Sequence, residues 1–271
     1  MRPYRSVHAA LRRVRVWGIA MRKLGLLLPF VVVFGVIFGS ASLLAQPLGT
    51  GSSENFKTPV TTAVVPIQGA SNQVIEDLAF LSDGSVVVVG SYEGTSIEFN
   101  PKGTSTTRTS AGSSDAFVAV YDRNGVLSAI AAIGTVAGND VFRGVSVDAS
   151  DNVYIAGTVS TGAINVNPNG GALNFSQTNE SAIAIKMTNA LLHTWTVRID
   201  GQGAATHFNS IAVNSSGDVG IAGAFSGSGV DINTGAGTQS VSSAGGGDAL
   251  FISLSSAGVF QWGGKIGGTS T

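Results

Sequence analysis

Short apolar runs of four to seven residues, rich in Val, Ile, Ala and Phe, recur along residues 73–271. Clusters of Gly, Asp, Asn and Ser separate them, as in Asp83-Gly84 and Asp151-Asn152. Apolar or β-branched runs bounded by such turn residues are typical of β-strands. The pattern therefore predicts an all-β body made of short strands and tight turns.

The strand pattern repeats with a long period. Residues 78–90 align with residues 145–157 and 211–223, at spacings of 67 and then 66. Three further blocks keep this register: 97–101, 164–168 and 230–234; 115–120, 181–186 and 248–253; 125–134, 190–199 and 258–267. Such self-similarity is the signature of a repeat architecture. It predicts three units, over 73–140, 141–207 and 208–271.

Each unit is expected to hold four main antiparallel strands, with a short extra hairpin around the Asn-Pro block. Four antiparallel strands per unit is the arrangement of a β-propeller blade. The recurrent Gly90, Gly157 and Gly223 indicate close approach of two backbones. We interpret Trp195 and Trp262, which recur in the closing strand, as rings packed between adjacent blades; a ligand-stacking role for one of them is the alternative.

Several blocks carry a more specific pattern: residues 144–148 read Gly-Val-Ser-Val-Asp, 152–157 read Asn-Val-Tyr-Ile-Ala-Gly, and 115–121 read Asp-Ala-Phe-Val-Ala-Val-Tyr. With the Asn-Pro block at 164–168 and the Gly-to-Trp stretch at 258–262, they resemble the bacterial β-propeller repeat family known as SBBP. The resemblance covers about residues 73–271. It implies an extracellular or envelope propeller, usually part of a larger protein, and no catalytic signature.

Three blades form an incomplete ring, because propellers close with four to eight. We expect the sequence to be a fragment of a longer reading frame. The alternatives are that its blades pair with another chain, or that they remain an open array with exposed edges.

The N-terminal region, residues 1–45, has the pattern of an export signal. Seven Lys and Arg precede residue 24, and an uncharged run follows to Ala45. This order predicts a hydrophobic helix acting as a signal peptide cleaved near Ala45, or an uncleaved signal anchor that is the only membrane contact. Residues 46–72 are interpreted as a spacer; the alternative is that they supply a strand that completes the ring with the last blade. Both readings of residues 1–45 place the body outside the cytoplasm, secreted or at the cell surface or envelope.

Charge and cysteine content narrow the function classes. Beyond residue 45 the chain has eight basic and sixteen acidic residues, and it has no cysteine. An acidic body argues against nucleic-acid binding, which requires a basic face. The lack of cysteine excludes disulfides, a thiol nucleophile and thiolate metal sites.

No catalytic, cofactor-binding or metal-binding residue is assigned from the sequence. His193 and His207 do not stand at a metal-ligand spacing. Calcium is a minor alternative, because several Asp residues lie in or beside turns, where carboxylates bind this ion; they are Asp83, Asp115, Asp148, Asp151, Asp231 and Asp248. Asp at a turn more often accepts hydrogen bonds from its own backbone.

The favoured hypothesis is a non-enzymatic exported or cell-surface scaffold that binds protein or carbohydrate through its blade loops. Loops vary freely when neighbouring strands hold the core. The alternative is an exported hydrolase or lyase with its site in the central channel, for which Asp148 and Asp231 are the best candidates. Fold alone does not decide between them.

Overall fold

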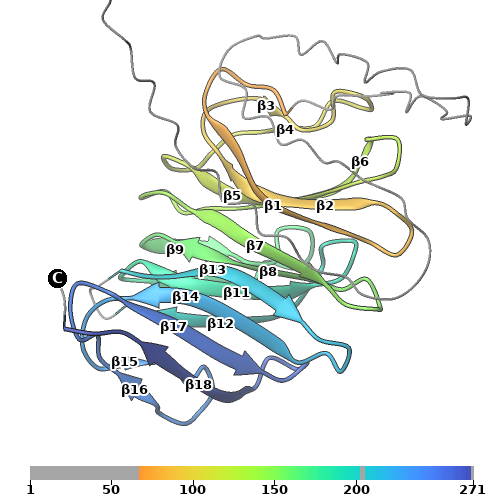
Figure 1. Ribbon diagram of the computed structural model, residues 1–271. Helices are drawn as coiled ribbons and strands as arrows, with labels where there is room; N and C mark the ends of the chain where they lie inside the picture. The colour runs from red at the N-terminus through yellow and green to blue at the C-terminus, as the bar shows by residue number, and fades with distance from the viewer. Residues whose placement is uncertain (1–66, 202–204, 270–271) are drawn as a thin grey trace, which may run out of the picture. The chain divides into compact units, whose positions relative to one another are not determined.

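The computed structural model describes residues 67–201 and 205–269, which lie in the compact unit Thr58–Thr271 (Figure 1). Every regular element in these ranges is a β-strand, which confirms the predicted all-β class for this part of the chain. Within it there is no helix with the length and apolar content to cross a membrane. The hydrophobic helix predicted at 1–45 lies outside the described residues.

The described residues form three four-stranded antiparallel sheets, one per repeat, consistent with propeller-like blades. Blade 1 contains β1 (Gln73–Phe80), β2 (Val86–Tyr92), β5 (Asp115–Tyr121) and β6 (Leu127–Ile133), paired in that order. Blade 2 contains β7 (Val141–Val147), β8 (Val153–Val159), β11 (Ser181–Met187) and β12 (His193–Asp200). Blade 3 contains β13 (Thr206–Val213), β14 (Val219–Phe225), β17 (Asp248–Leu254) and β18 (Phe260–Ile266).

The extra hairpin predicted between the second and third main strands is also present in each blade. The hairpins are β3 (Ile97–Glu98) with β4 (Thr107–Arg108), β9 (Gly162–Asn165) with β10 (Asn174–Gln177), and β15 (Val230–Asp231) with β16 (Ser240–Val241). Outside the repeats, Gln68 pairs with Glu98 of the first hairpin, a contact that the sequence did not indicate.

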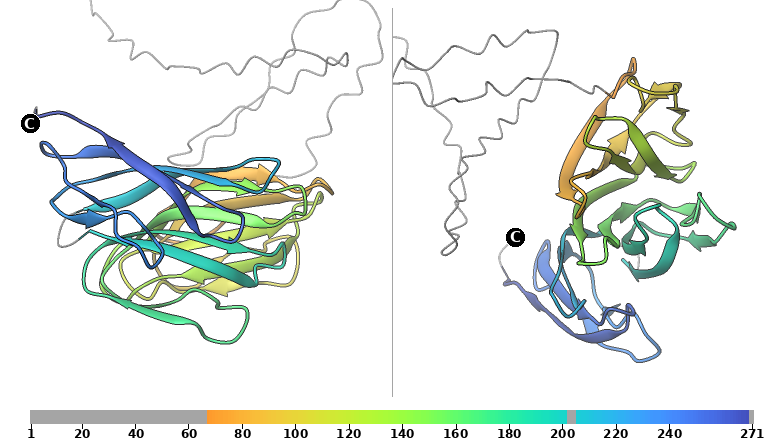
Figure 2. Two further views of the ribbon diagram at one scale, coloured as in Figure 1. Left: turned by 90° about the horizontal axis from the view of Figure 1, so that it is seen from below. Right: turned by 90° about the vertical axis from the view of Figure 1, so that its right-hand side faces the viewer.

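The blades follow one another in chain order and pack through apolar side chains (Figures 1 and 2). We call the face of a blade toward the preceding repeat its front face, and the opposite one its back face. In blade 2, Ile183 and Ile185 lie on the front face, in a cluster shared with blade 1. Ala182 and Ala184 lie on the back face, in a cluster shared with blade 3. This alternation is the two-residue period of a strand buried on both sides.

The predicted close approach at the recurrent glycines is confirmed. The first strand of each blade has a β-bulge opposite the glycine of the second strand. A Cβ on Gly157 would stand 2.0 Å from the carbonyl oxygen of Val141, and Gly90 and Gly223 are equally crowded by Val74 and His207. Only glycine leaves room for the bulged strand at this point.

The turn of the first hairpin uses a left-handed residue at one register position in all three blades. Gly84 and Gly217 have φ of 84°, and Asp151 has φ of 61°. The sequence placed this turn correctly, although in blade 2 the left-handed residue is Asp151 itself. Asp adopts that conformation more readily than most residues. Its carboxylate accepts hydrogen bonds from the backbone amide and the hydroxyl of Ser82 in blade 1, which hold the turn in place.

Candidate functional site

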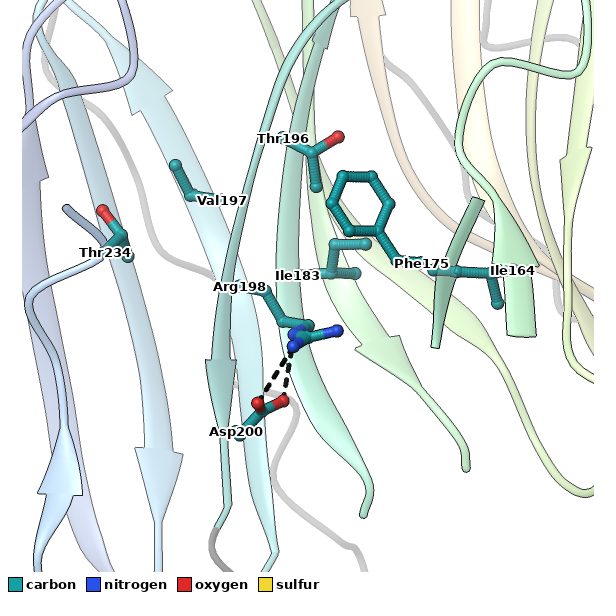
Figure 3. Close-up of a pocket in the computed structure, with 8 residues that line it drawn as sticks. All are labelled: Ile164, Phe175, Ile183, Thr196, Val197, Arg198, Asp200 and Thr234. Carbon is teal, nitrogen blue, oxygen red and sulfur yellow. Dashed lines mark hydrogen bonds and ion pairs between the residues drawn. The ribbon is translucent and has the colours of Figure 1, made fainter. Parts of the chain in front are cut away.

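A cleft of about 230 Å³ opens beside β12, between the insertion hairpins of blades 2 and 3 (Figure 3). Its floor is apolar, with Ile164, Phe175 and Ile183. Thr196, Arg198 and Asp200 alternate along β12 and therefore project from the same face of that strand. The cleft thus combines one aromatic ring with a short row of polar groups.

An ion pair forms the polar wall of the cleft. Arg198 Nε lies 3.0 Å from Asp200 Oδ1, and Nη2 donates to Oδ2 at 3.0 Å, as Figure 3 shows. Nη1 donates to the backbone carbonyl of Ser176 at 3.3 Å. A guanidinium has five N–H donors in a fixed plane. Both side chains are partly exposed, so donors and carboxylate lone pairs remain accessible to a ligand.

Thr234 of blade 3 also lines this cleft, across β12 from the ion pair (Figure 3). The hydroxyl of Thr234 is buried and has no hydrogen-bond partner within the described residues. A buried polar group without a partner costs free energy unless something satisfies it. Because this oxygen is enclosed, it belongs to the packing behind the cleft and not to the surface that a ligand can reach.

In blade 2 the carboxylate of this ion pair, Asp200, lies on the fourth main strand, whereas the corresponding carboxylates of blades 1 and 3 lie on the third. Blades 1 and 3 carry Asp115 and Asp248 at the start of the third main strand, and a glycine at the end of the fourth. A Cβ on Gly134 would stand 2.2 Å from the Asp115 carboxyl, so that glycine is required. In blade 2 these positions hold Ser181 and Asp200, and the serine hydroxyl donates to the Asp200 carboxylate at 2.6 Å.

This exchange makes the blade 2 carboxylate accessible while the other two are enclosed. Asp115 is buried and accepts hydrogen bonds from the backbone of Ala111, and its burial raises its pKa above the ordinary value. Asp248 is buried and accepts from Lys265 at 2.6 Å, a hydrogen bond that lowers its pKa. Asp200 is the member of this set that lines a cleft.

No family model and no curated protein matches this chain. The resemblance to bacterial β-propeller repeats therefore stays a prediction from the repeat motifs.

The two histidines considered as metal ligands, His193 and His207, have different surroundings. His193 begins β12, its Nε2 lies 2.9 Å from the Thr196 hydroxyl, and burial lowers its pKa. His207 lies in β13, where burial and the charge of Arg143 lower its pKa. Among residues 67–201 and 205–269, no three His, Asp or Glu side chains gather closely enough to hold a metal ion.

Asp148 and Asp231, the carboxylates considered for catalysis, are engaged in local hydrogen bonds. Asp148 accepts from the backbone of Ser150 and Asn152 and from the Tyr154 hydroxyl at 2.8 Å. Its burial would raise the pKa, but these hydrogen bonds outweigh burial and the pKa lies below the ordinary value. Asp231 accepts from the backbone of Asn233 and Gln239 inside its own hairpin. Both therefore stabilise turns, as the sequence indicated.

A set of polar residues, one in each blade, was not identified from the sequence. The bulged residue of each first strand differs between repeats, and is Glu76, Arg143 or Asn209. Arg143 donates to the Thr158 hydroxyl at 2.5 Å, and its burial lowers its pKa against the opposing charges of Glu76 and Glu180. The recurrent glycines indicated a close approach of the first two strands, but the sequence does not show which residue of the first strand a bulge will leave unpaired.

The two tryptophans have different surroundings. Trp195 lies against the backbone of Gly258 and donates from Nε1 to the Ser256 carbonyl at 3.1 Å, so it packs between blades 2 and 3 as predicted. Trp262 stands edge-on to Phe251 at 5.9 Å and is exposed on the back face of blade 3. The structure therefore confirms the prediction of packing between blades for Trp195 alone.

Proposed function

We propose that this chain is a non-enzymatic exported or cell-surface β-propeller scaffold, which binds carbohydrate or protein through the loops and hairpins of its blades. The proposal is supported by the three blade-like sheets, whose strands leave hairpins and turns free to vary. The N-terminal sequence pattern supports export.

The single observation that carries the proposal is the cleft beside β12. It offers an exposed ion pair and an aromatic ring within one small volume. At about 230 Å³ it is smaller than the roughly 300–1,000 Å³ of pockets for drug-sized ligands. One sugar ring or one peptide side chain fits this scale, which favours recognition of a residue within a longer polymer.

The chemistry of the cleft favours carbohydrate as the first ligand class to test. Sugar hydroxyls both donate and accept, so they can bond to the guanidinium and carboxylate together. The apolar face of a sugar ring can pack on Phe175. A charge-assisted hydrogen bond contributes about 1.5–3 kcal/mol, so loss of the guanidinium should weaken binding about 10- to 100-fold.

The test is binding of the full chain to an array of immobilised neutral and acidic oligosaccharides, followed by titration of each positive glycan. We expect Arg198→Ala to lose binding. Arg108→Ala is the control, because Arg108 is also an arginine, lies on the insertion hairpin of blade 1, donates to the carbonyl of its neighbour Thr107 and does not line the cleft. Circular dichroism checks that both variants keep the wild-type fold.

Two results would contradict the proposal. Equal binding by Arg198→Ala and the wild type would remove the cleft from recognition. Cleavage of a positive glycan during incubation, detected by chromatography of the products, would favour the exported hydrolase or lyase instead.

A further inference from the structure

The back face of blade 3 carries exposed apolar side chains at positions that are buried in the other two blades. Ile266 is 71% exposed, whereas Ile133 and Ile199, at the same register position, are each 1% exposed. Trp262 is 58% exposed, while its counterpart Trp195 is packed against blade 3. The face is therefore built as a blade interface and has no blade on it within the described residues.

The front face of blade 1 shows the complementary feature along its first strand, β1; further along the same face, Phe117 and Ala119 are already buried in a cluster with Phe99 of the insertion hairpin. Ile75 is 51% exposed, whereas Phe142 and Phe208, its register equivalents, are fully buried at the interfaces between blades. Phe80 is 67% exposed, whereas its equivalent Val147 packs into the cluster between blades 1 and 2. Exposed apolar groups gathered on one face indicate an interaction surface.

We propose that a second copy of this chain covers both faces: the front face of its blade 1 docks on the back face of blade 3, and the reciprocal contact closes a six-bladed ring. Six blades fall within the four to eight of known propellers. Because the arrangement has a two-fold axis, both contacts are equivalent and no apolar end face is left open. This inference is independent of the proposed ligand cleft.

The two internal interfaces show how outer-strand residues and turns match in size. Trp195 of blade 2 lies against Gly258, the left-handed residue of the turn before β18, where a Cβ would stand 2.8 Å from the ring. At the interface of blades 1 and 2 the sizes are reversed, with Ala129 on the outer strand and Leu191 at the turn, both in one apolar cluster. A large ring thus accompanies a glycine, and a small side chain accompanies a leucine.

This matching selects blade 1 as the partner of blade 3. Blade 3 presents Trp262, which requires a glycine at the turn opposite, and blade 1 has Gly125 at that register position, with φ of 75°. The indole of Trp262 can therefore lie on Gly125 of the second copy as Trp195 lies on Gly258. Blade 2, with Leu191 at its turn, would not accept the ring.

A second size match points to the same partner. The back face of blade 3 has a hollow of about 330 Å³, whose lining includes Gly220 and Ala222. In blade 1 the corresponding residues are Val87 and Val89, and they share an apolar cluster with Val147 of blade 2. In the proposed contact Phe80 of blade 1 takes the place of Val147, so a larger side chain packs against the smaller Gly220 and Ala222. Close packing across an interface favours such exchanges of volume.

The test is the mass of the purified full chain by light scattering over a range of concentrations, in a mild detergent that keeps the N-terminal segment dispersed. We expect a dimer, and dissociation to the monomer in Ile266→Asp, because a charge would be buried against the apolar front face. Val136→Asp is the matched control: Val136 is equally exposed but lies in the loop between blades 1 and 2. It should remain a dimer.

Cross-linking gives a second reading that does not depend on a destabilising variant. Ser82 contacts the turn of blade 2 that holds Ser150 and Asp151; the register equivalents across the proposed contact are Ser215 and Asp83 of the second copy. Since the chain has no cysteine, Ser215→Cys with Asp83→Cys should give a covalent dimer with a short bismaleimide. A wild-type monomer at every concentration, a dimer that survives Ile266→Asp, or assemblies larger than the dimer would each overturn the proposal.

Discussion

Gly157 tests the account of how the first strand of a blade packs on the second. A Cβ at this position would stand 2.0 Å from the Val141 carbonyl oxygen and 2.7 Å from Cα of Phe142, both backbone atoms. Neither can rotate away, so Gly157→Ala must push β7 off β8. Overpacking of a buried site costs about 1–3 kcal/mol. We expect that loss in the free energy of unfolding, measured by urea denaturation followed by far-ultraviolet circular dichroism.

Gly171→Ala is the control for this prediction. Gly171 lies in the turn of the hairpin β9–β10, and no atom lies within 4 Å of its added Cβ. Replacing such a glycine reduces the entropy of the unfolded chain and stabilises by about 0.4–1 kcal/mol. If Gly157→Ala is as stable as Gly171→Ala, the close approach at the bulge does not exist and the reasoning fails.

Three further predictions concern stability. Burial raises the pKa of Asp140 to about 6, so the folded chain keeps this proton to a higher pH than the unfolded chain. The free energy of unfolding should therefore fall by about 2–3 kcal/mol between pH 4 and pH 7. In a pH series of urea midpoints, Asp140→Asn should flatten this part of the curve. Phe142→Ala should cost about 3–5 kcal/mol, because the ring is fully buried between blades 1 and 2; a thermal melt matching the wild type would contradict this. Gly134→Asp should destabilise blade 1, and adding Asp115→Ser should recover stability by recreating the Ser181 and Asp200 arrangement; additive losses in a double-mutant cycle would rule out that coupling.

The strand layout could be predicted because it depends on local sequence. Apolar runs, turn residues and a fixed period are all visible along the chain, and they determined four strands and one hairpin per repeat. The crowding at Gly90, Gly157 and Gly223 was also predictable, since a glycine that recurs inside a strand commonly marks a bulge or a close backbone contact.

The candidate site was not predictable, because it depends on register between strands. The exchange of Asp and Gly for Ser181 and Asp200 is visible in the sequence only after the third and fourth strands are known to pair. The orientation of Arg198 toward the cleft likewise follows from the side of β12 that the hairpin β9–β10 covers. Sequence reasoning examined carboxylates at turns, and the paired carboxylate of the cleft stands at the end of a strand.

Repetition alone also misled the interpretation of the tryptophans. Trp195 and Trp262 occupy one register position, so both were assigned to the space between blades. The structure shows that the environment depends on whether another blade follows, and Trp262 is exposed. A repeated residue therefore indicates a repeated design of the face, while its burial depends on the partner.

The packing of the three repeats as consecutive blades in one register can be tested directly by cysteine cross-linking. Ser82→Cys with Ser150→Cys probes the contact between blades 1 and 2, and Ala149→Cys with Ser216→Cys probes the equivalent contact between blades 2 and 3. Both pairs should cross-link within one chain, identified by peptide mass spectrometry of the band that migrates as a monomer in denaturing electrophoresis. Ser82→Cys with Ser216→Cys, which would skip blade 2, should give no such product in the monomer band; in the proposed dimer these two positions approach each other only between copies, so their link appears in the dimer band. A cross-link of the skipping pair within the monomer band, or none in the second pair, would contradict the account.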